Sequence, residues 1–183
     1  MAHGLSWGFG WGWTATRSVA AVVGALALGA CVAAPGCSGP TAPEGYAIVE
    51  LGGRSFTLEI VADPATRERG LGGRESIPED GGMLFSFPDA QVRQFVMRDC
   101  LFPIDIVFLD ANGVIVAMHH MPLDEPRREG ESDMAYERRL KRYSSRFNAR
   151  YAIEIRGGLL EELDLRAGER VELDTKRLAG MTR

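Results

Sequence analysis

Two apolar runs on either side of an Asn-Gly pair constrain the fold of this chain more than any other feature. Residues 104–110 (IDIVFLD) and 114–121 (VIVAMHHM) are separated by residues 111–113 (ANG). Asn-Gly supplies the positive φ angles that a tight turn requires, so we expect the two runs to form a β-hairpin. Because nearly every position of both runs is apolar, we expect the hairpin to lie centrally in a sheet that is covered on both faces.

The rest of the folded region consists of short elements separated by glycine- and proline-containing turns. Alternation and turn signals predict strands at 46–51, 55–61, 83–87, 95–97, 151–156 and 170–173, with turns at 52–53 and 88–89. Short helices are predicted after Asp63-Pro64, which supply an N-cap and a first helical residue, and at 159–163. We therefore predict a mainly β, α+β fold, in which residues 46–183 form a single compact β-sandwich or barrel-like domain with two or three short helices and a loose basic tail.

Residues 123–148 combine a helical stripe with a basic face. Tyr136, Leu140, Tyr143 and Phe147 recur at helical spacing, which predicts an amphipathic helix at 135–147. The other face of this helix is rich in arginine. Two interpretations remain open: a surface helix with a solvated basic face, or a basic cap that attracts anionic lipid headgroups or an acidic ligand.

The first forty residues predict an exported, lipid-anchored protein. Residues 18–29 (SVAAVVGALALG) form a twelve-residue apolar run, which is too short to span a bilayer and suits a signal peptide. Residues 28–31 (LGAC) resemble the lipobox of bacterial lipoproteins, whose cysteine is lipidated and becomes the first residue after cleavage. We predict a signal peptide at 1–30, lipidation of Cys31, a flexible tether at 31–45, and a location in the cell envelope or periplasm. An uncleaved membrane anchor is the alternative.

Charge and cysteine content narrow the possible partners. Removal of residues 1–30 takes away Arg17 and no acidic residue, which leaves 20 basic and 25 acidic side chains and a net charge of −5. This balance argues against nucleic acid as a partner, and we expect a monomer that meets the membrane through its lipid. Two cysteines remain beyond Cys31: either Cys37 and Cys100 form a disulfide, or Cys100 is a small core residue.

Several blocks of the folded region resemble a known family. They are RERGLGGR, GMLFSF, the strand with Met97 that leads to PIDIVFLD, and RYAIE followed by GERVEL, in this order between about residues 54 and 174. In these blocks the chain resembles the uncharacterised family called domain of unknown function 192. The resemblance implies a small, mainly β, commonly exported domain, and it implies no established activity.

Two segments depart from that family's pattern. Residues 95–100 (FVMRDC) stand where the family usually has an aromatic-Trp-Met-Lys-Asn-Thr run, so Arg98 takes the place of the lysine, and Asp99 and Cys100 change the charge and hydrogen bonding. Residues 123–148 are longer than the resemblance leads us to expect, and we interpret them as an insertion.

The histidines and Cys100 carry no spacing that is typical of a metal site, and catalysis by Cys100 is only the alternative interpretation. His119 and His120 are adjacent on a predicted strand and point to opposite faces, so the pair cannot hold one ion without a bulge. The sequence has no metal-binding spacing, and we expect neither a metal nor a cofactor. Cys100 with a histidine base, oriented by Asp99 or Asp105, would suit a small hydrolase that uses carboxylate or thiol chemistry, and this is the alternative function.

Asp105 is the most informative single residue, because it interrupts an otherwise apolar strand. An unpaired carboxylate there is costly, so we expect either a partner such as Arg74 or Arg98, or a polar cleft. The candidate ligand-binding residues are Met97, Arg98, Asp99, Asp105 and Arg74. We assign no catalytic residue, and we expect a non-catalytic accessory module that binds a small ligand or an envelope protein.

Overall fold

A computed structural model of the protein describes residues 41–183. The predicted signal peptide, the lipidation of Cys31 and the partner role of Cys37 fall outside these residues. Within the described part of the chain, Cys100 is a free cysteine. None of the helices found there is long and apolar enough to cross a membrane.

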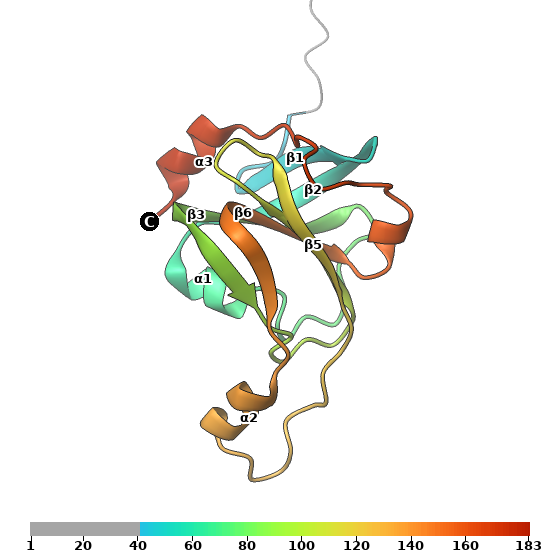
Figure 1. Cartoon of the computed structure of the whole chain (residues 1–183), viewed down its shortest axis with the longest axis vertical. Coiled ribbons are helices and arrows are strands. Elements are labelled where there is room, and N and C mark those ends of the chain that lie inside the picture. Colours follow the sequence, from blue (N-terminus) through green and yellow to red (C-terminus); the bar gives the residue numbers. More distant parts are fainter. Residues whose placement is uncertain (1–40) are drawn as a thin grey trace, which may run out of the picture. The chain divides into compact units, whose positions relative to one another are not determined.

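Six strands form one mixed sheet with the order β1-β2-β3-β6-β4-β5 (Figure 1). The strands are β1 (Tyr46–Leu51), β2 (Arg54–Val61), β3 (Gly81–Phe95), β4 (Ile104–Leu109), β5 (Ile115–Met121) and β6 (Tyr143–Arg156). The helices are α1 (Pro64–Arg69), α2 (Asp133–Arg139), α3 (Thr175–Met181) and the short 3-10 helix η1 (Leu159–Glu161). Only β2 and β3 pair in parallel. The predicted mainly β, α+β class is confirmed, and the sheet is open, with β1 and β5 as its edges rather than closed into a barrel.

The predicted hairpins are present. Gly52 and Gly53 turn β1 into β2 with φ angles of 55° and 77°. β4 and β5 pair around Gly113, whose φ is 79°. Every residue of β4 is buried, as the apolar run predicts. The hairpin is not central, however, because β5 is an edge strand and the middle of the sheet is formed by β3 and β6.

The two central strands are longer than predicted. β3 runs through Pro88, where a turn was expected, and it stops at Phe95. The register of β3 against β6 shifts between Ser86 and Gln91, and this irregularity removes the need for a ladder hydrogen bond from the proline nitrogen. The pairing of β3 with β2 runs from Gly81 to Phe85. The second half of β3 therefore pairs with β6 alone.

The predicted helix at 135–147 is wrong in its second half. α2 ends at Arg139, and β6 begins at Tyr143, which pairs with Phe95 of β3. Tyr136, Leu140 and Tyr143 are buried as the stripe predicts, but Phe147 is 65% exposed. Pairing with a neighbouring strand that lies 48 residues away in the sequence outweighs the helical periodicity of this segment.

Two further predictions at the C-terminal end need correction. Residues 170–173 form no strand, and a single bridge joins Val114 to Arg170. The expected loose tail contains α3, which is capped by Asp174 and buries Leu178 against the core. The cap and one buried leucine are enough to order this short helix on the sheet.

The sheet has a different cover on each face. One face packs Leu84, Val107 and Ile153 under η1 and α3. The other face carries Phe85 and Phe108. Further apolar residues, from the segments next to α1 and after β3, pack on this face. Side chains of the second face are the ones that surround the pocket described below.

Candidate functional site

Glu154 is a buried acid in the central strand β6. It lies between Ile153 and Ile155, and it pairs in register with Met83 of β3 and Ile106 of β4. Because side chains alternate along a strand, Glu154 points to the face that carries Met83 and Ile106. Only 5% of the residue is exposed. The sheet therefore places a carboxyl group within an apolar layer.

The carboxyl group of Glu154 has no internal partner to compensate its burial. Its Oε2 atom is buried without a hydrogen-bond partner among the described residues. Burial raises the pKa of Glu154 from an ordinary value of 4.5 to about 8. The group is therefore protonated at neutral pH, and a neutral carboxyl can both donate and accept a hydrogen bond.

Glu154 lines a pocket of about 400 Å³. The other lining residues are 67–72 at the end of α1, Phe85, Phe87, 92–96, Arg98 and Cys100. Its walls combine apolar rings with charged side chains, and a concave pocket with a few convergent polar groups is a usual form of a small-molecule site. The carboxyl group that lacks a hydrogen-bond partner among residues 41–183 therefore belongs to the lining of this pocket.

Gly70 lines the pocket beside Glu154 and leaves the space next to the carboxyl group free of a side chain. It ends α1 with a φ of 52°, and its N–H donates to the carbonyl oxygen of Thr66. A Cβ atom at Gly70 would lie 3.5 Å from Cζ of Phe85 and 3.7 Å from Oε2 of Glu154. A side chain here would fill space directly beside the carboxyl, in a backbone conformation that disfavours L residues.

Phenylalanine rings supply the apolar walls. The rings of Phe85 and Phe95 meet edge to face with centroids 5.1 Å apart, and Phe87 and Phe95 do so at 6.3 Å. The guanidinium groups of Arg93 and Arg67 lie over the ring of Phe87, at 4.1 and 5.5 Å from its centroid.

Four arginines line the same pocket, and three of them have partners. Arg67 donates to the carbonyl oxygens of Ala62, Ser86 and Arg183. Arg93 forms an ion pair with Asp89, and Arg98 forms one with Glu137. The exposed side chain of Arg69 makes no hydrogen bond or ion pair with any residue in the range 41–183.

The candidate residues at positions 97–99 lie in two kinds of place, the hydrophobic core and the pockets. Met97 is buried in the core. Arg98 lines both the Glu154 pocket and a second pocket of about 390 Å³, which Asp99 also lines. Asp99 has a φ of 53°, and its N–H donates to Oη of Tyr136 at 3.1 Å.

Asp105 lies on the opposite face of the sheet from Glu154, and its partner is not an arginine. The residue is 0% exposed. Its Oδ1 lies 2.6 Å from Nδ1 of His120, and its Oδ2 accepts a hydrogen bond of 2.8 Å from the N–H of Leu160. The expected pairing of Asp105 with Arg74 or Arg98 is therefore wrong: Arg74 pairs with Glu59 at 2.7 Å. A histidine on the adjacent strand and a backbone N–H of η1 satisfy the carboxyl instead.

The two histidines point to opposite faces, as the strand alternation predicts. His120 meets Asp105, whereas Nε2 of His119 lies 2.7 Å from the carbonyl oxygen of Ser144, on the other face. Between residues 41 and 183, no three His, Cys, Asp or Glu side chains gather in a group that could hold a metal ion.

Cys100 lines the pocket as a protonated thiol. Burial raises its pKa to about 12, and the negative charges near it act in the same direction. Its Sγ lies 3.5 Å from the carbonyl oxygen of Arg98, to which the thiol donates.

We expect Cys100 to alkylate slowly. A pKa of about 12 in place of 9.0 lowers the thiolate fraction at neutral pH by roughly three orders of magnitude. Iodoacetamide labelling of the native protein at pH 7.5, followed by mass spectrometry, measures the rate against a model thiol. Labelling as fast as the model thiol would contradict this assignment, and labelling in urea is the control for reagent quality.

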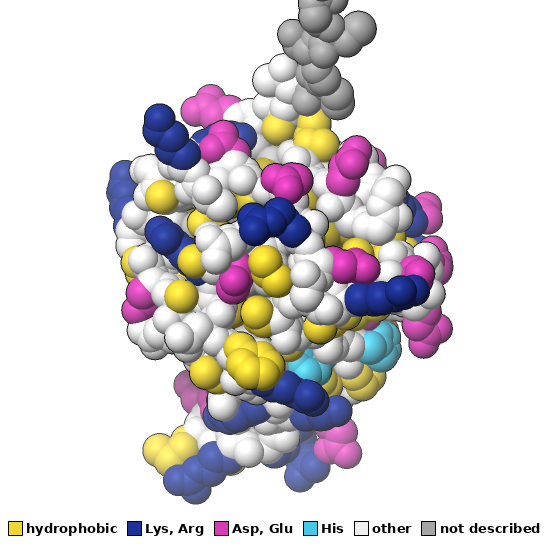
Figure 2. All heavy atoms as spheres, turned by 45° about the horizontal axis from the view of Figure 1, so that its top comes forward, with side chains coloured by type: hydrophobic (Ala, Val, Ile, Leu, Met, Phe, Trp, Pro, Cys, Tyr) yellow, Lys and Arg dark blue, Asp and Glu magenta, His cyan; other side chains and the backbone are white. Residues whose placement is uncertain are grey.

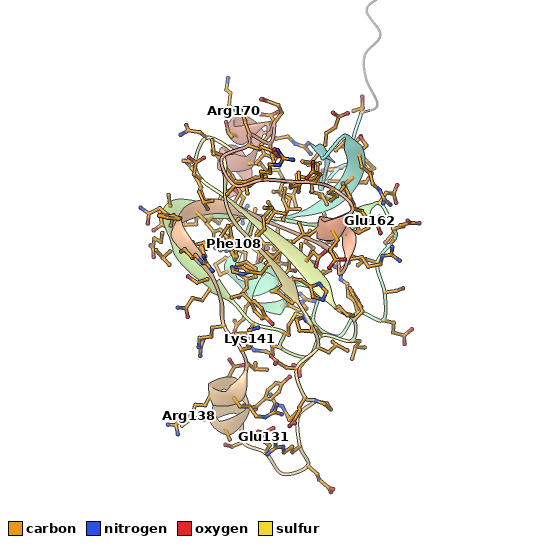
Figure 3. All side chains as sticks on the ribbon, turned by 45° about the vertical axis from the view of Figure 1, so that its right-hand side comes forward. Phe108, Glu131, Arg138, Lys141, Glu162 and Arg170 are labelled. Atoms are coloured by element: carbon orange, nitrogen blue, oxygen red, sulfur yellow. The ribbon has the colours of Figure 1, made fainter. Side chains whose placement is uncertain are left out.

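The 123–142 excursion carries α2 away from the sheet, as Figure 3 shows for the segment with Glu131, Arg138 and Lys141. Tyr136 holds the excursion: the residue is buried, and its Oη accepts the hydrogen bond from Asp99. Guanidinium groups of Arg127 and Arg139 stack on its ring at 4.6 and 4.9 Å. The excursion is thus attached directly to the run that lines the pockets.

Basic side chains gather over the excursion, at the lower end of the view in Figure 2. Much of this charge is paired locally: Arg139 bonds with Glu131 at 2.8 Å, and Arg127 pairs with Asp133. The single basic helical face predicted from the sequence does not form, because α2 is only seven residues long.

We expect Tyr136→Ala to release the excursion without unfolding the sheet. The change removes the buried ring, the hydrogen bond to Asp99 and both stacking contacts. Limited trypsin digestion should then cut at Arg127 or Arg128 at least tenfold faster. Tyr136→Phe is the matched control, since it keeps the ring, and equal cleavage rates for all three proteins would contradict the anchoring role.

Sequence reasoning missed Glu154 although the signal was present. A glutamate between two isoleucines in an apolar run is the same pattern that singled out Asp105. The difference between the two acids lies in their partners, and no local pattern predicts those.

These observations define a class of protein: a small α+β domain on an open mixed sheet, with a buried neutral carboxyl in a pocket on one face. Residues 47–173 match the family DUF192, described as Uncharacterized ACR. The chain belongs to this family. No functionally curated protein matches the sequence.

Two solved structures share the fold. One is a protein from Sinorhizobium meliloti 1021 that is described as a candidate transcription regulator; it is 27% identical, with a TM-score of 0.55, and the match covers 73% of this chain and 97% of that one. The other is a protein of unknown function from Novosphingobium aromaticivorans DSM 12444, 20% identical, with a TM-score of 0.59 and coverage of 75% and 94%. The second likeness shows the fold alone.

Proposed function

We propose that this protein is a lipid-anchored binding module of the cell envelope, which holds a small ligand in the Glu154 pocket and catalyses no reaction. The observation that carries the proposal is the buried Oε2 atom of Glu154, which lacks a partner and lines a pocket of about 400 Å³. An unsatisfied buried polar group costs about 1–3 kcal/mol. A ligand that supplies the missing hydrogen bond recovers that free energy on binding.

The protonation states speak against the thiol or carboxylate chemistry of the alternative function. With pKa values raised to about 8 and about 12, neither Glu154 nor Cys100 is ionised at neutral pH. A neutral carboxyl cannot act as a general base or nucleophile and a neutral thiol is a poor nucleophile, whereas a protonated carboxyl can still donate a proton or a hydrogen bond. The residues of the hydrolase alternative do not converge, since Asp105 bonds to His120 and Leu160 on the opposite face from Cys100.

The envelope location rests on the sequence. The apolar run at 18–29 and the LGAC ending at Cys31 support export and lipidation, and the acidic net charge of −4 speaks against a nucleic-acid partner. This charge is our reason for not extending a regulator's role from the Sinorhizobium protein to this one.

Native mass spectrometry of the full-length protein, purified from its own membranes in detergent, tests the binding proposal. We expect a reproducible bound mass on the wild type, and its loss in Glu154→Met, which keeps the shape of the side chain and removes its oxygens. Glu161→Met is the matched control, because Glu161 is exposed in η1. A bound mass that survives Glu154→Met would exclude this pocket, and wild-type protein without any bound mass would contradict the binding role.

We expect the anchor to depend on Cys31. Wild-type protein should partition into the detergent phase of a Triton X-114 separation, and its N-terminal peptide should carry acyl chains by mass spectrometry. Cys31→Ser should lose the acyl mass and stay in an unprocessed form. An N-terminal peptide that begins at Met1 in the wild type would favour the uncleaved anchor instead.

A further inference from the structure

The charges around the Glu154 pocket are unequal. Its lining contains four arginines, the side chain of Glu68, which lies 3.9 Å from Arg98, and the neutral carboxyl of Glu154. Arg93 and Arg98 are matched by Asp89 and Glu137, which lie outside the lining. Of the remaining two guanidinium groups, Arg67 donates to backbone oxygens of Ala62, Ser86 and the last residue, Arg183, and Arg69 has no bonded partner among residues 41–183. The pocket therefore favours an anion and disfavours a cation.

The charged groups and the carboxyl lie at different depths. Arg69 is exposed and Arg67 is half-buried, whereas Glu154 and Phe85 are buried. The apolar wall formed by the rings of Phe85, Phe87 and Phe95 belongs to the same lining. A ligand that satisfies all three features needs a charged end toward the arginines, an apolar middle, and a neutral polar end toward Glu154.

We propose that the pocket selects a small aromatic monoanion whose opposite end bears a neutral hydroxyl or carbonyl group. The inference rests on the proposed function, that is, on the pocket holding a small ligand. The anionic group lies beside Arg67 and Arg69, the ring packs against the phenylalanines, and the neutral end exchanges a hydrogen bond with the Glu154 carboxyl. The raised pKa of Glu154 supports this arrangement, because a protonated carboxyl does not repel an anion.

The groups that face Glu154 come from every element around it. Gly70 at the end of α1 lies beside Oε2, since a Cβ atom there would be 3.7 Å from it, and the ring of Phe85 of β3 lies next to Gly70. Cys100, which follows β3, carries a protonated thiol whose pKa is raised mainly by burial. Among the lining residues, the charges are those of Glu68 and the four arginines.

A matched fragment set tests the ligand class on the full-length protein. One ring is presented as carboxylate, carboxamide or methylamine, each with and without a para-hydroxyl: 4-hydroxybenzoate and benzoate, 4-hydroxybenzamide and benzamide, 4-hydroxybenzylamine and benzylamine. Ligand-observed NMR titrations give the affinities. We expect 4-hydroxybenzoate to bind at least tenfold tighter than its amide and its amine, and about three- to tenfold tighter than benzoate.

Three variants assign these preferences to residues. Glu154→Met should remove the preference for the hydroxyl group, and Glu154→Gln should keep it, since an amide also donates and accepts. Arg69→Ala should weaken 4-hydroxybenzoate by about two- to fivefold and leave the amide unchanged. Thermal unfolding checks that each variant folds, and Glu154→Gln serves if Glu154→Met does not.

The outcomes separate the ligand class from the binding role. If the amides or amines bind as tightly as the carboxylates, the monoanion class is overturned and the pocket remains a ligand site. If hydroxyl preference persists in Glu154→Met, the role of Glu154 is overturned. If no fragment of any charge binds and the native spectrum shows no bound mass, both this inference and the proposed function fail.

Discussion

Replacing Asp105 by alanine is expected to lower the free energy of unfolding by about 2–4 kcal/mol. The side chain is completely buried, and its two oxygens bond to Nδ1 of His120 and to the N–H of Leu160. Alanine would leave the N–H of Leu160 without its acceptor and open a cavity between β4 and η1. Urea unfolding followed by far-ultraviolet circular dichroism measures the loss.

Asp105→Asn is the matched control for this change. An amide keeps one oxygen to accept from Leu160 and has an NH₂ group to donate to Nδ1 of His120, so most of the stability should remain. If alanine and asparagine are equally destabilising, the negative charge rather than the hydrogen bonds holds Asp105 in place. If alanine has no effect, the structural role assigned to this residue is wrong.

The stability of the protein is expected to fall as the pH rises from about 4.5 to about 8, through the titration of Glu154. Burial raises the pKa of this carboxyl in the folded state above its value of 4.5 in the unfolded chain, so the folded state holds the proton more tightly. The contribution is fully present below pH 4.5, declines by at most about 1.4 kcal/mol per pH unit, and is lost once the pH exceeds the folded pKa.

Glu154→Gln separates this titration from all others. The amide cannot ionise, so the difference in unfolding free energy between wild type and variant should change by a few kcal/mol between pH 5 and 8, in the direction of a relatively more stable variant at high pH. Urea unfolding at pH 5, 6.5 and 8 measures that difference. A difference that does not vary with pH would show that Glu154 is ionised in the folded protein.

The two buried acids show what a sequence pattern can predict about a side chain and what it cannot. Asp105 and Glu154 each interrupt an apolar strand, and the pattern predicts that each is buried. Whether an acid is satisfied depends on residues that the chain brings from elsewhere. Leu160, 55 residues away, satisfies Asp105, whereas the residues that approach Glu154 offer it no hydrogen bond. Of the candidate ligand-binding residues, Asp105 and Arg74 bond to partners elsewhere, whereas Arg98 and Asp99 line adjacent pockets.

The errors in secondary structure have the same origin. The segment at 143–147 has helical periodicity, yet it pairs with β3, and β3 continues past Pro88 because β6 runs alongside it with a register shift. The central strands β3 and β6 stabilise each other by pairing. The length of each strand therefore cannot be predicted from its own residues alone.

The sequence by itself determined the parts that depend on neighbouring residues. The Gly-Gly and Asn-Gly turns, the Asp63-Pro64 helix start, the burial of β4 and the family resemblance all follow from short stretches of chain, because turn and cap geometries are local. Only the tertiary structure decided the order of the strands, the partner of Asp105 and the pocket around Glu154. The partner of Asp105 depends on contacts of β4 with β5 and η1, and the pocket depends on contacts between α1, β3 and β6. The free energy of a buried carboxyl is set by the groups that surround it in space.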